Sequence, residues 1–327
     1  MQTQHSTLHG ALFALLAFGI FATHDVIVKF LGAHYTPFQI VFFSTLMGFP
    51  LVTVMLIGDR TDGNLRPRHP WWTAARMAAA TVTGAAAFYA FATLPLAQVY
   101  AILFASPLII TLLAIPILGE KVRLRRGAAV IVGLLGVLIV LRPGDVELGL
   151  GHLAAITAAC TGAFASVVVR KIGNEERSAV LLLYPMLGNF VAMGAVLPFV
   201  YEPMPILHFA SLALIALMGF AGMICVIAAY RRAEAVIVAP MQYSQILWAT
   251  AYGYLIFGET IDAMTALGAG VIIASGLYIV FRESRLGASR TPVLATQSRH
   301  ETGTAPRVSL LARLTGHAAG AERRAPD

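Results

Sequence analysis

Ten long apolar segments dominate this sequence and leave few folds open to it. Each holds roughly 20 mostly apolar residues, the length that an α-helix needs to cross the ~30 Å hydrocarbon core of a bilayer. The chain is 58% hydrophobic and 12% charged, whereas soluble domains are about 45–50% apolar and about 25% charged. We therefore predict an all-α membrane protein with ten transmembrane helices. Their expected positions are 10–31, 37–57, 73–93, 97–118, 126–142, 150–170, 178–200, 209–230, 236–257 and 263–281.

A proline separates two of the apolar segments, and a change in composition marks the end of the last one. The third and fourth segments are separated by little more than Leu94, Pro95 and Leu96, and a proline inside a helix removes a hydrogen bond and breaks it. After the tenth segment, residues 282–327 are rich in Gly, Ala, Ser, Thr, Pro and scattered Arg. This composition predicts a disordered C-terminal tail.

Lysine and arginine are concentrated in alternate loops. The second, fourth, sixth and eighth loops hold twelve of them, at positions 60, 66, 68, 121, 123, 125, 126, 170, 171, 177, 231 and 232. The other five loops hold only Arg142. Because cytoplasmic loops carry the Lys/Arg excess, we predict an inner (plasma) membrane protein whose N- and C-termini and tail are cytoplasmic. The net charge of +7 therefore indicates a membrane surface and not a nucleic-acid partner.

One motif occurs twice, and only its first copy is basic. Gly119-Glu120 and Gly258-Glu259 each follow an apolar segment, and the first pair is followed by Lys121, Arg123, Arg125 and Arg126. Five segments separate the copies, so the second crosses the membrane in the opposite direction, where basic residues would oppose the predicted topology. The sequence therefore predicts two inverted five-helix repeats, residues 1–142 and 149–281. Such repeats are typical of secondary transporters.

These features resemble the drug/metabolite transporter superfamily, specifically its EamA-type ten-helix members. The resemblance covers about residues 10–282 and is carried by the doubled halves, by Pro107, by the two Gly-Glu pairs and by the glycine-spaced helices after them. It implies a secondary transporter for a small organic metabolite, amino-acid-like, S-adenosylmethionine-like or another drug or metabolite. The stretch 25–29 is similar to a subgroup of uptake carriers for S-adenosylmethionine or riboflavin. Members of that subgroup tend to have an arginine near the position of Ser44.

Charged residues inside a bilayer are unfavourable and usually face the interior of a helix bundle. Asp25 and Lys29 are four residues apart, so they share one helix face and can pair, and His24 precedes Asp25. One interpretation makes Asp25 a site for a proton or a substrate amine, with Lys29 tuning it and His24 as a relay. The alternative is a purely structural ion pair, with Lys29 reaching toward the outer surface.

The densest polar stripe lies in the ninth segment. Gln242, Gln245, Trp248 and Tyr252 follow helical spacing, which predicts one wall of a substrate cavity with amide hydrogen bonds and aromatic stacking. The alternative is contacts between helices plus an aromatic belt at the interface. The other candidate substrate-binding residues are Tyr100 and Ser106 in the fourth segment, Tyr89 in the third and Asn189 in the seventh.

Two other functional classes remain as alternatives: an integral membrane enzyme and a channel-like pore. An enzyme would need clustered nucleophiles, bases or metal ligands, and no two histidines in a span have ligand spacing. Cys160 and Cys225 show no zinc or redox spacing. We therefore predict no catalytic residues, no metal and no cofactor. The expected partners are a small-molecule substrate, the lipid bilayer and, as an option, a second copy of the chain in a homodimer.

Overall fold

The computed structural model describes residues 2–57, 65–120, 124–143, 148–173 and 175–286. Within these ranges the chain forms twelve helices and no strands, so the predicted all-α membrane class is confirmed. The helices are α1 (Gln2–Gly32), α2 (Pro37–Ile57), α3 (Pro70–Thr93), α4 (Leu96–Leu103), α5 (Ser106–Leu118), α6 (Leu124–Leu141), α7 (Leu150–Ile172), α8 (Ser178–Val200), α9 (Ile206–Arg232), α10 (Ala235–Met241), α11 (Ser244–Phe257) and α12 (Ala263–Leu286).

Seven spans in the described part of the chain are long and apolar enough to cross a membrane. They are Leu8–Gly32, Pro37–Val54, Leu96–Leu118, Leu150–Ile172, Ala179–Val200, Ile206–Arg232 and Ala263–Phe281. Gly127–Leu141 in α6 is apolar but shorter. The last helix continues to Leu286, into the first residues of the predicted tail. The rest of that tail, residues 287–327, lies outside the described residues.

Two of the predicted helices are each divided into two. In the span 97–118, Pro107 has no N–H to give to the carbonyl of Leu103, four residues before it. The hydroxyl of Ser106 donates to that carbonyl instead, at 2.7 Å. As a result α4 ends and α5 begins around Phe104. The segment 236–257 is also divided, into α10 and α11, but its Pro240 lies inside α10 and precedes the break by two residues.

Each Gly-Glu pair ends its helix through the same backbone geometry. Gly119 and Gly258 have φ of 70° and 66°, a left-handed conformation that glycine adopts without steric penalty. The N–H of Glu120 donates to the carbonyl of Ala114 at 3.3 Å, and that of Glu259 to Gly253 at 2.9 Å. These six-residue closures satisfy helix-end carbonyls in the manner of a Schellman motif.

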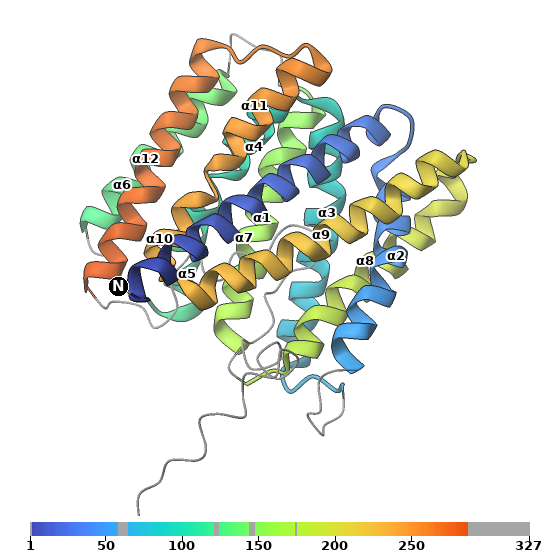
Figure 1. The fold of residues 1–327 in the computed structure, drawn as a ribbon, viewed down its shortest axis with the longest axis horizontal. Coiled ribbons are helices and arrows are strands. Elements are labelled where there is room, and N and C mark those ends of the chain that lie inside the picture. The colour runs from blue at the N-terminus through green and yellow to red at the C-terminus, as the bar shows by residue number, and fades with distance from the viewer. Residues whose placement is uncertain (1, 58–64, 121–123, 144–147, 174, 287–327) are drawn as a thin grey trace, which may run out of the picture.

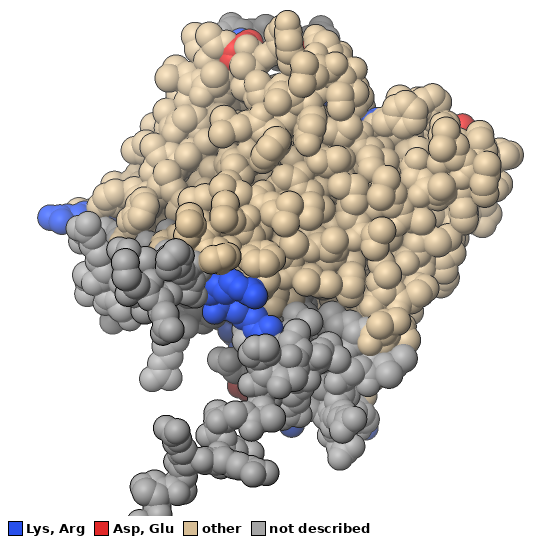
Figure 2. All heavy atoms as spheres, in the orientation of Figure 1, with Lys and Arg blue, Asp and Glu red and all other residues tan. Residues whose placement is uncertain are grey.

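The helices pack as one bundle, shown in Figure 1. The most extensive helix contacts are between α1 and α9, between α3 and α7, and between α6 and α12. The α6–α12 pair and the α2–α8 pair lie on opposite sides of these central helices. Uncharged side chains cover a broad band of the face shown in Figure 2, and the charged side chains lie near its borders. Such a surface is suited to lipid contact.

Candidate functional site

A buried polar cluster lies on α1 where it meets α4 and α11. Asp25 is 5% exposed and His24 is completely buried. One carboxylate oxygen of Asp25 is 2.7 Å from His24 Nδ1, and the other accepts a short hydrogen bond from the Tyr100 hydroxyl. Gln245 Nε2 in turn donates to that hydroxyl at 3.4 Å. Hydrogen bonds of this kind offset the large penalty for placing a carboxylate among apolar helices.

Beyond this cluster, further polar and aromatic side chains of α11 lie beside α1. The hydroxyl groups of Thr23 and Tyr252 are 2.9 Å apart. Trp248 stacks with Tyr252, with ring centroids separated by 6.2 Å and planes inclined by 25°. Trp248 is 41% exposed, so part of its indole is open to further contact.

The ion pair that we expected between Asp25 and Lys29 is replaced by a different one. Lys29 Nζ lies 2.7 Å from Glu259 Oε1 and donates to the carbonyl of Leu94 at 2.5 Å. The second oxygen of Glu259 accepts the N–H of Leu96 at 3.0 Å. Lys29 therefore connects α1 to the Gly-Glu motif of the second half, and it leaves Asp25 to His24 and Tyr100.

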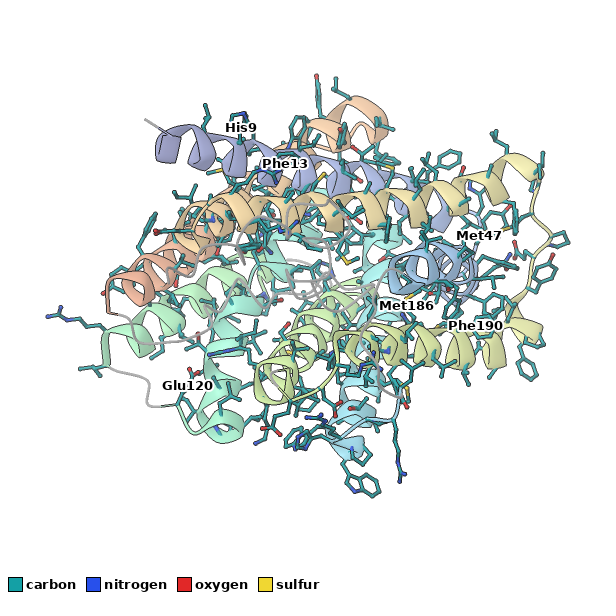
Figure 3. All side chains as sticks on the ribbon, turned by 60° about the horizontal axis from the view of Figure 1, so that its bottom comes forward. His9, Phe13, Met47, Glu120, Met186 and Phe190 are labelled. Carbon is teal, nitrogen blue, oxygen red and sulfur yellow. The ribbon has the colours of Figure 1, made fainter. Side chains whose placement is uncertain are left out.

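The glutamate of the first Gly-Glu motif also forms an ion pair with a basic residue. Glu120 pairs with Arg170 near the end of α7, and the neighbouring Lys171 donates to the carbonyl of Ile117 at 2.7 Å. Glu259 contacts the start of the span Leu96–Leu118, whereas Glu120 follows its end. The two glutamates therefore occupy opposite ends of the bundle. Figure 3 labels Glu120 at the edge of the bundle remote from Met47 and Phe190.

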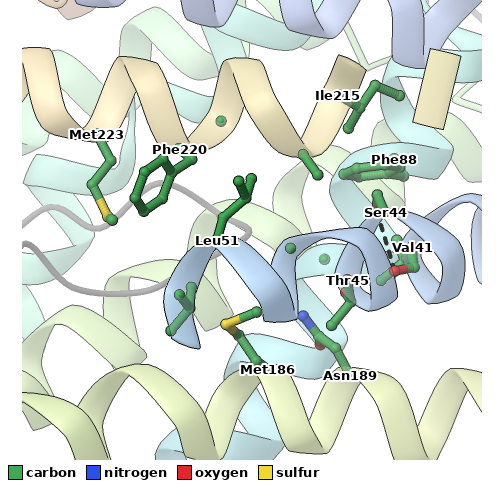
Figure 4. A pocket seen from close by; sticks show the side chains of 15 residues that line it. Val41, Ser44, Thr45, Leu51, Phe88, Met186, Asn189, Ile215, Phe220 and Met223 are labelled. Atoms are coloured by element: carbon green, nitrogen blue, oxygen red, sulfur yellow. Dashed lines mark hydrogen bonds between the residues drawn. The ribbon is translucent and has the colours of Figure 1, made fainter. Parts of the chain in front are cut away.

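A pocket of about 600 Å³, including space open to its surroundings, lies between α2, α3, α8 and α9. Figure 4 shows its walls. It is lined by Val41, Ser44, Thr45, Gly48, Leu51, Val52, Gly84, Phe88, Met186, Asn189, Ile215, Ala216, Gly219, Phe220 and Met223. Phe88 also packs edge-on against His24, with ring centroids 6.3 Å apart. One aromatic ring therefore separates this pocket from the polar cluster around Asp25.

The candidate residues fall into three groups in the structure. Asn189 lines the pocket, and Tyr100 and Gln245 join Asp25. Trp248 and Tyr252 extend along α11 beside α1, as described above. The remaining three are Gln242, Ser106 and Tyr89. Gln242 is partly buried at the end of α10, and Tyr89 is partly buried in α3. The hydroxyl of Ser106 donates to the backbone carbonyl of Leu103.

Most of the pocket walls were not among the predicted site residues. Thr45, Phe88, Met186 and Met223 are buried uncharged residues within helices, and nothing in their local sequence separates them from residues of an ordinary core. Of the lining residues, the sequence indicated only Asn189, as a candidate substrate contact, and Ser44, as a departure from the pattern of a similar subgroup. Among the described residues, no three His, Cys, Asp or Glu residues are grouped so as to hold a metal ion.

Known proteins similar to this chain are transporters. The model of the EamA-like transporter family matches residues 8–142 and 149–281. The S-adenosylmethionine uptake transporter of Rickettsia prowazekii (strain Madrid E) is 24% identical over 287 residues, 86% of this chain and 96% of that protein. The pseudopaline exporter CntI of Pseudomonas aeruginosa (strain UCBPP-PA14) is 26% identical over 276 residues, 81% and 94% of the two chains. One solved crystal structure, 18% identical, has a TM-score of 0.54 and covers 86% of this chain and 99% of that chain.

Proposed function

Because the chain belongs to the EamA-like transporter family, we propose that it is a secondary transporter that works by alternating access across the inner membrane. Its membrane-length helices and its similarity to named metabolite transporters make it a multi-pass transporter of small metabolites. The two relatives differ in substrate and in direction, so the family alone names neither for this chain. The proposed cargo is an amphipathic metabolite, amino-acid-like, S-adenosylmethionine-like or another small organic molecule.

The proposed architecture is two inverted five-helix repeats, residues 1–142 and 149–281, in a ten-span bundle. Its support is a set of correspondences between the halves. The family matches the chain in two blocks, and the broken helices α4–α5 and α10–α11 each end at a left-handed glycine before a glutamate. The packing of α1 on α9 also corresponds to that of α7 on α3. Inverted repeats allow one half to rock against the other around a central site.

The observation that carries this proposal is the buried Asp25 cluster, one aromatic ring away from an uncharged pocket. A carboxylate held between His24 and Tyr100 can take up or release a proton as its surroundings change. We assign Asp25 and His24 to coupling. Asn189 belongs to the adjoining pocket, and Gln245 and Tyr100 connect the cluster to α11. The other proposed substrate contacts are Tyr89, Ser106, Gln242, Trp248 and Tyr252.

Lys29 acquires a different role from the one expected. Its ion pair with Glu259 and the pair of Arg170 with Glu120 each join the first helix of one half to the Gly-Glu motif of the other. In an alternating-access cycle, contacts at opposite ends of the bundle must open in turn. We therefore assign the two ion pairs to closing the two ends of the proposed pathway.

Proteoliposomes that contain the purified chain test this function. The vesicles are loaded with a metabolite extract or bathed in it, a proton gradient is applied, and the accumulated compounds are identified by mass spectrometry. We expect accumulation that saturates with substrate, collapses when the gradient is dissipated and leaves the compound chemically unchanged. A changed product would indicate an enzyme, and flux that never saturates would indicate a channel-like pore.

A further inference from the structure

The pocket between α2 and α8 contains two polar side chains without hydrogen-bond partners in the described structure. Asn189 is 2% exposed, and its Oδ1 is fully buried and unbonded. The hydroxyl of Thr45, from the facing helix α2, also makes no hydrogen bond to a described residue. Figure 4 shows the two side chains directed toward one another at the pocket wall. Because the large majority of buried side-chain polar atoms in proteins are hydrogen-bonded, the buried and unbonded Oδ1 of Asn189 indicates a missing partner.

The remaining walls restrict what that partner can be. None of the lining residues is charged, so a charged group bound there would lack a counter-ion and would be strongly disfavoured. The phenyl rings of Phe88 and Phe220 and the thioethers of Met186 and Met223 offer apolar, adaptable surfaces that favour flat rings.

The primary amide of Asn189 offers a donor and an acceptor side by side. Its complement is a neutral edge that also carries a donor beside an acceptor, as in a lactam, an imide or an aminopyrimidine. Asparagine recognises the edge of adenine in this bidentate way. We propose that this pocket binds the uncharged heterocyclic part of the cargo, with its donor–acceptor edge on Asn189 and a further hydrogen bond to Thr45.

Gly84 leaves space beside the two polar atoms of this amide. A Cβ at Gly84 would lie 3.7 Å from Asn189 Nδ2 and 3.8 Å from Oδ1, and no other atom is closer. These are ordinary van der Waals distances, so alanine fits the fold there, but its methyl group would lie against both polar atoms of the amide and would hinder a partner that bonds to them. The inference rests on the proposed function only in calling the bound molecule a transported cargo. Binding of its donor–acceptor edge to Asn189 can be measured without transport.

Binding to protein in lipid nanodiscs tests the proposal. The probes are riboflavin and adenosine, each beside a methylated analogue that lacks the edge donor, N3-methylriboflavin and N6,N6-dimethyladenosine. We expect at least one parent compound to bind roughly 10–100-fold more tightly than its analogue, the discrimination typical of a bidentate amide pair. Asn189→Leu and Gly84→Ala should remove this preference while the melting temperature stays within a few degrees of wild type.

Gly270→Ala is the matched control, since a Cβ at Gly270 in α12 meets no atom within 4 Å. It should bind each pair as the wild type does. The inference is overturned if both pocket variants keep the preference, or if neither parent compound binds better than its analogue. A lipid acyl chain that fills the pocket and co-purifies would produce the second result. The transporter proposal would still stand on gradient-driven accumulation in proteoliposomes, which does not require any of these probes.

Discussion

Asp25 is held in the bundle interior by two neighbours of different chemistry, the imidazole of His24 and the phenol of Tyr100. The phenol donates a hydrogen bond to one carboxylate oxygen, and the imidazole lies against the other. In the proposed transport cycle, this carboxylate takes up and releases a proton as the surrounding helices move.

Asp25→Asn should separate coupling from binding. The amide has nearly the same size and can still hydrogen-bond to Tyr100, but it cannot ionise. We expect uptake into proteoliposomes to fall to the level measured without a proton gradient, while exchange of internal for external substrate continues. Tyr100→Phe, which removes one hydrogen bond but keeps the carboxylate, should shift the pH dependence of uptake without abolishing it. Gradient-driven accumulation by Asp25→Asn at the wild-type rate would rule out coupling through this residue.

The sequence pointed to Asp25 and to the neighbouring His24, but not to Tyr100 as a partner of the carboxylate. An acidic residue inside an apolar segment is conspicuous, and helical spacing suggested Lys29 as its partner because periodicity reveals only neighbours on the same helix. Tyr100 is 75 residues away in the chain, and Glu259 belongs to the other half. Such contacts depend on how the helices pack. The pocket was missed for the same reason, since Thr45 and Phe88 become a wall only when α2 and α3 meet α8 and α9.

At the scale of the helices, hydropathy located the apolar segments but not the interruptions within them. The division at Phe104 depends on one absent N–H, that of Pro107, and on one hydroxyl, that of Ser106. A hydropathy average over a membrane-length segment does not detect either of these two features. The helix ends were easier to predict from the sequence. A Gly-Glu pair after an apolar segment predicts a helix end, and the left-handed conformations of Gly119 and Gly258 confirm it.

The start of α12 provides a test of a single helix end. Asp262 Oδ1 accepts the N–H groups of Met264 and Thr265, both at 3.0 Å, and Oδ2 accepts the Thr265 hydroxyl at 2.6 Å. Replacing such an N-cap with alanine typically costs about 1 kcal/mol. Asp262→Ala should therefore lower the melting temperature by a few degrees. Thr260→Ala, in the same exposed loop, should leave it unchanged, and equal melting temperatures for the two variants would contradict the capping role.

This stabilisation should depend on pH in one direction. Partial desolvation alone would raise the pKa of Asp262, but hydrogen bonds from Thr265 and Met264 and the charge of Arg142 lower it below its ordinary value of 3.8. Because the folded pKa is the lower one, the contribution is complete above the ordinary value and is lost as the pH falls through the folded pKa. The melting-temperature difference between wild type and Asp262→Ala should therefore stay constant from neutral pH to about pH 5 and shrink only in stronger acid.

At the scale of the whole molecule, the two Gly-Glu motifs connect the halves to one another. The Lys29–Glu259 pair is mostly buried, with side chains 11% and 19% exposed, so it is screened less than a surface pair. A double-mutant cycle with Lys29→Gln and Glu259→Gln should give a coupling energy of about 0.5–3 kcal/mol in thermal unfolding. The cycle for Arg170 and Glu120 provides the comparison at the other end. Additive effects at both ends would show that the pairs do not hold the halves together.

The orientation of the molecule is the remaining whole-molecule prediction. Twelve basic residues in alternate loops, against Arg142 alone in the others, place both termini in the cytoplasm if the bundle has ten spans. Reporter fusions at residues 145 and 290 then lie on opposite sides, with 145 outside and 290 inside, because five spans separate the two positions. A phosphatase reporter should be active only at 145, and a cytoplasmic fluorescent reporter only at 290. Activity of the same reporter at both positions would require an even number of spans between them and would contradict the inverted repeat.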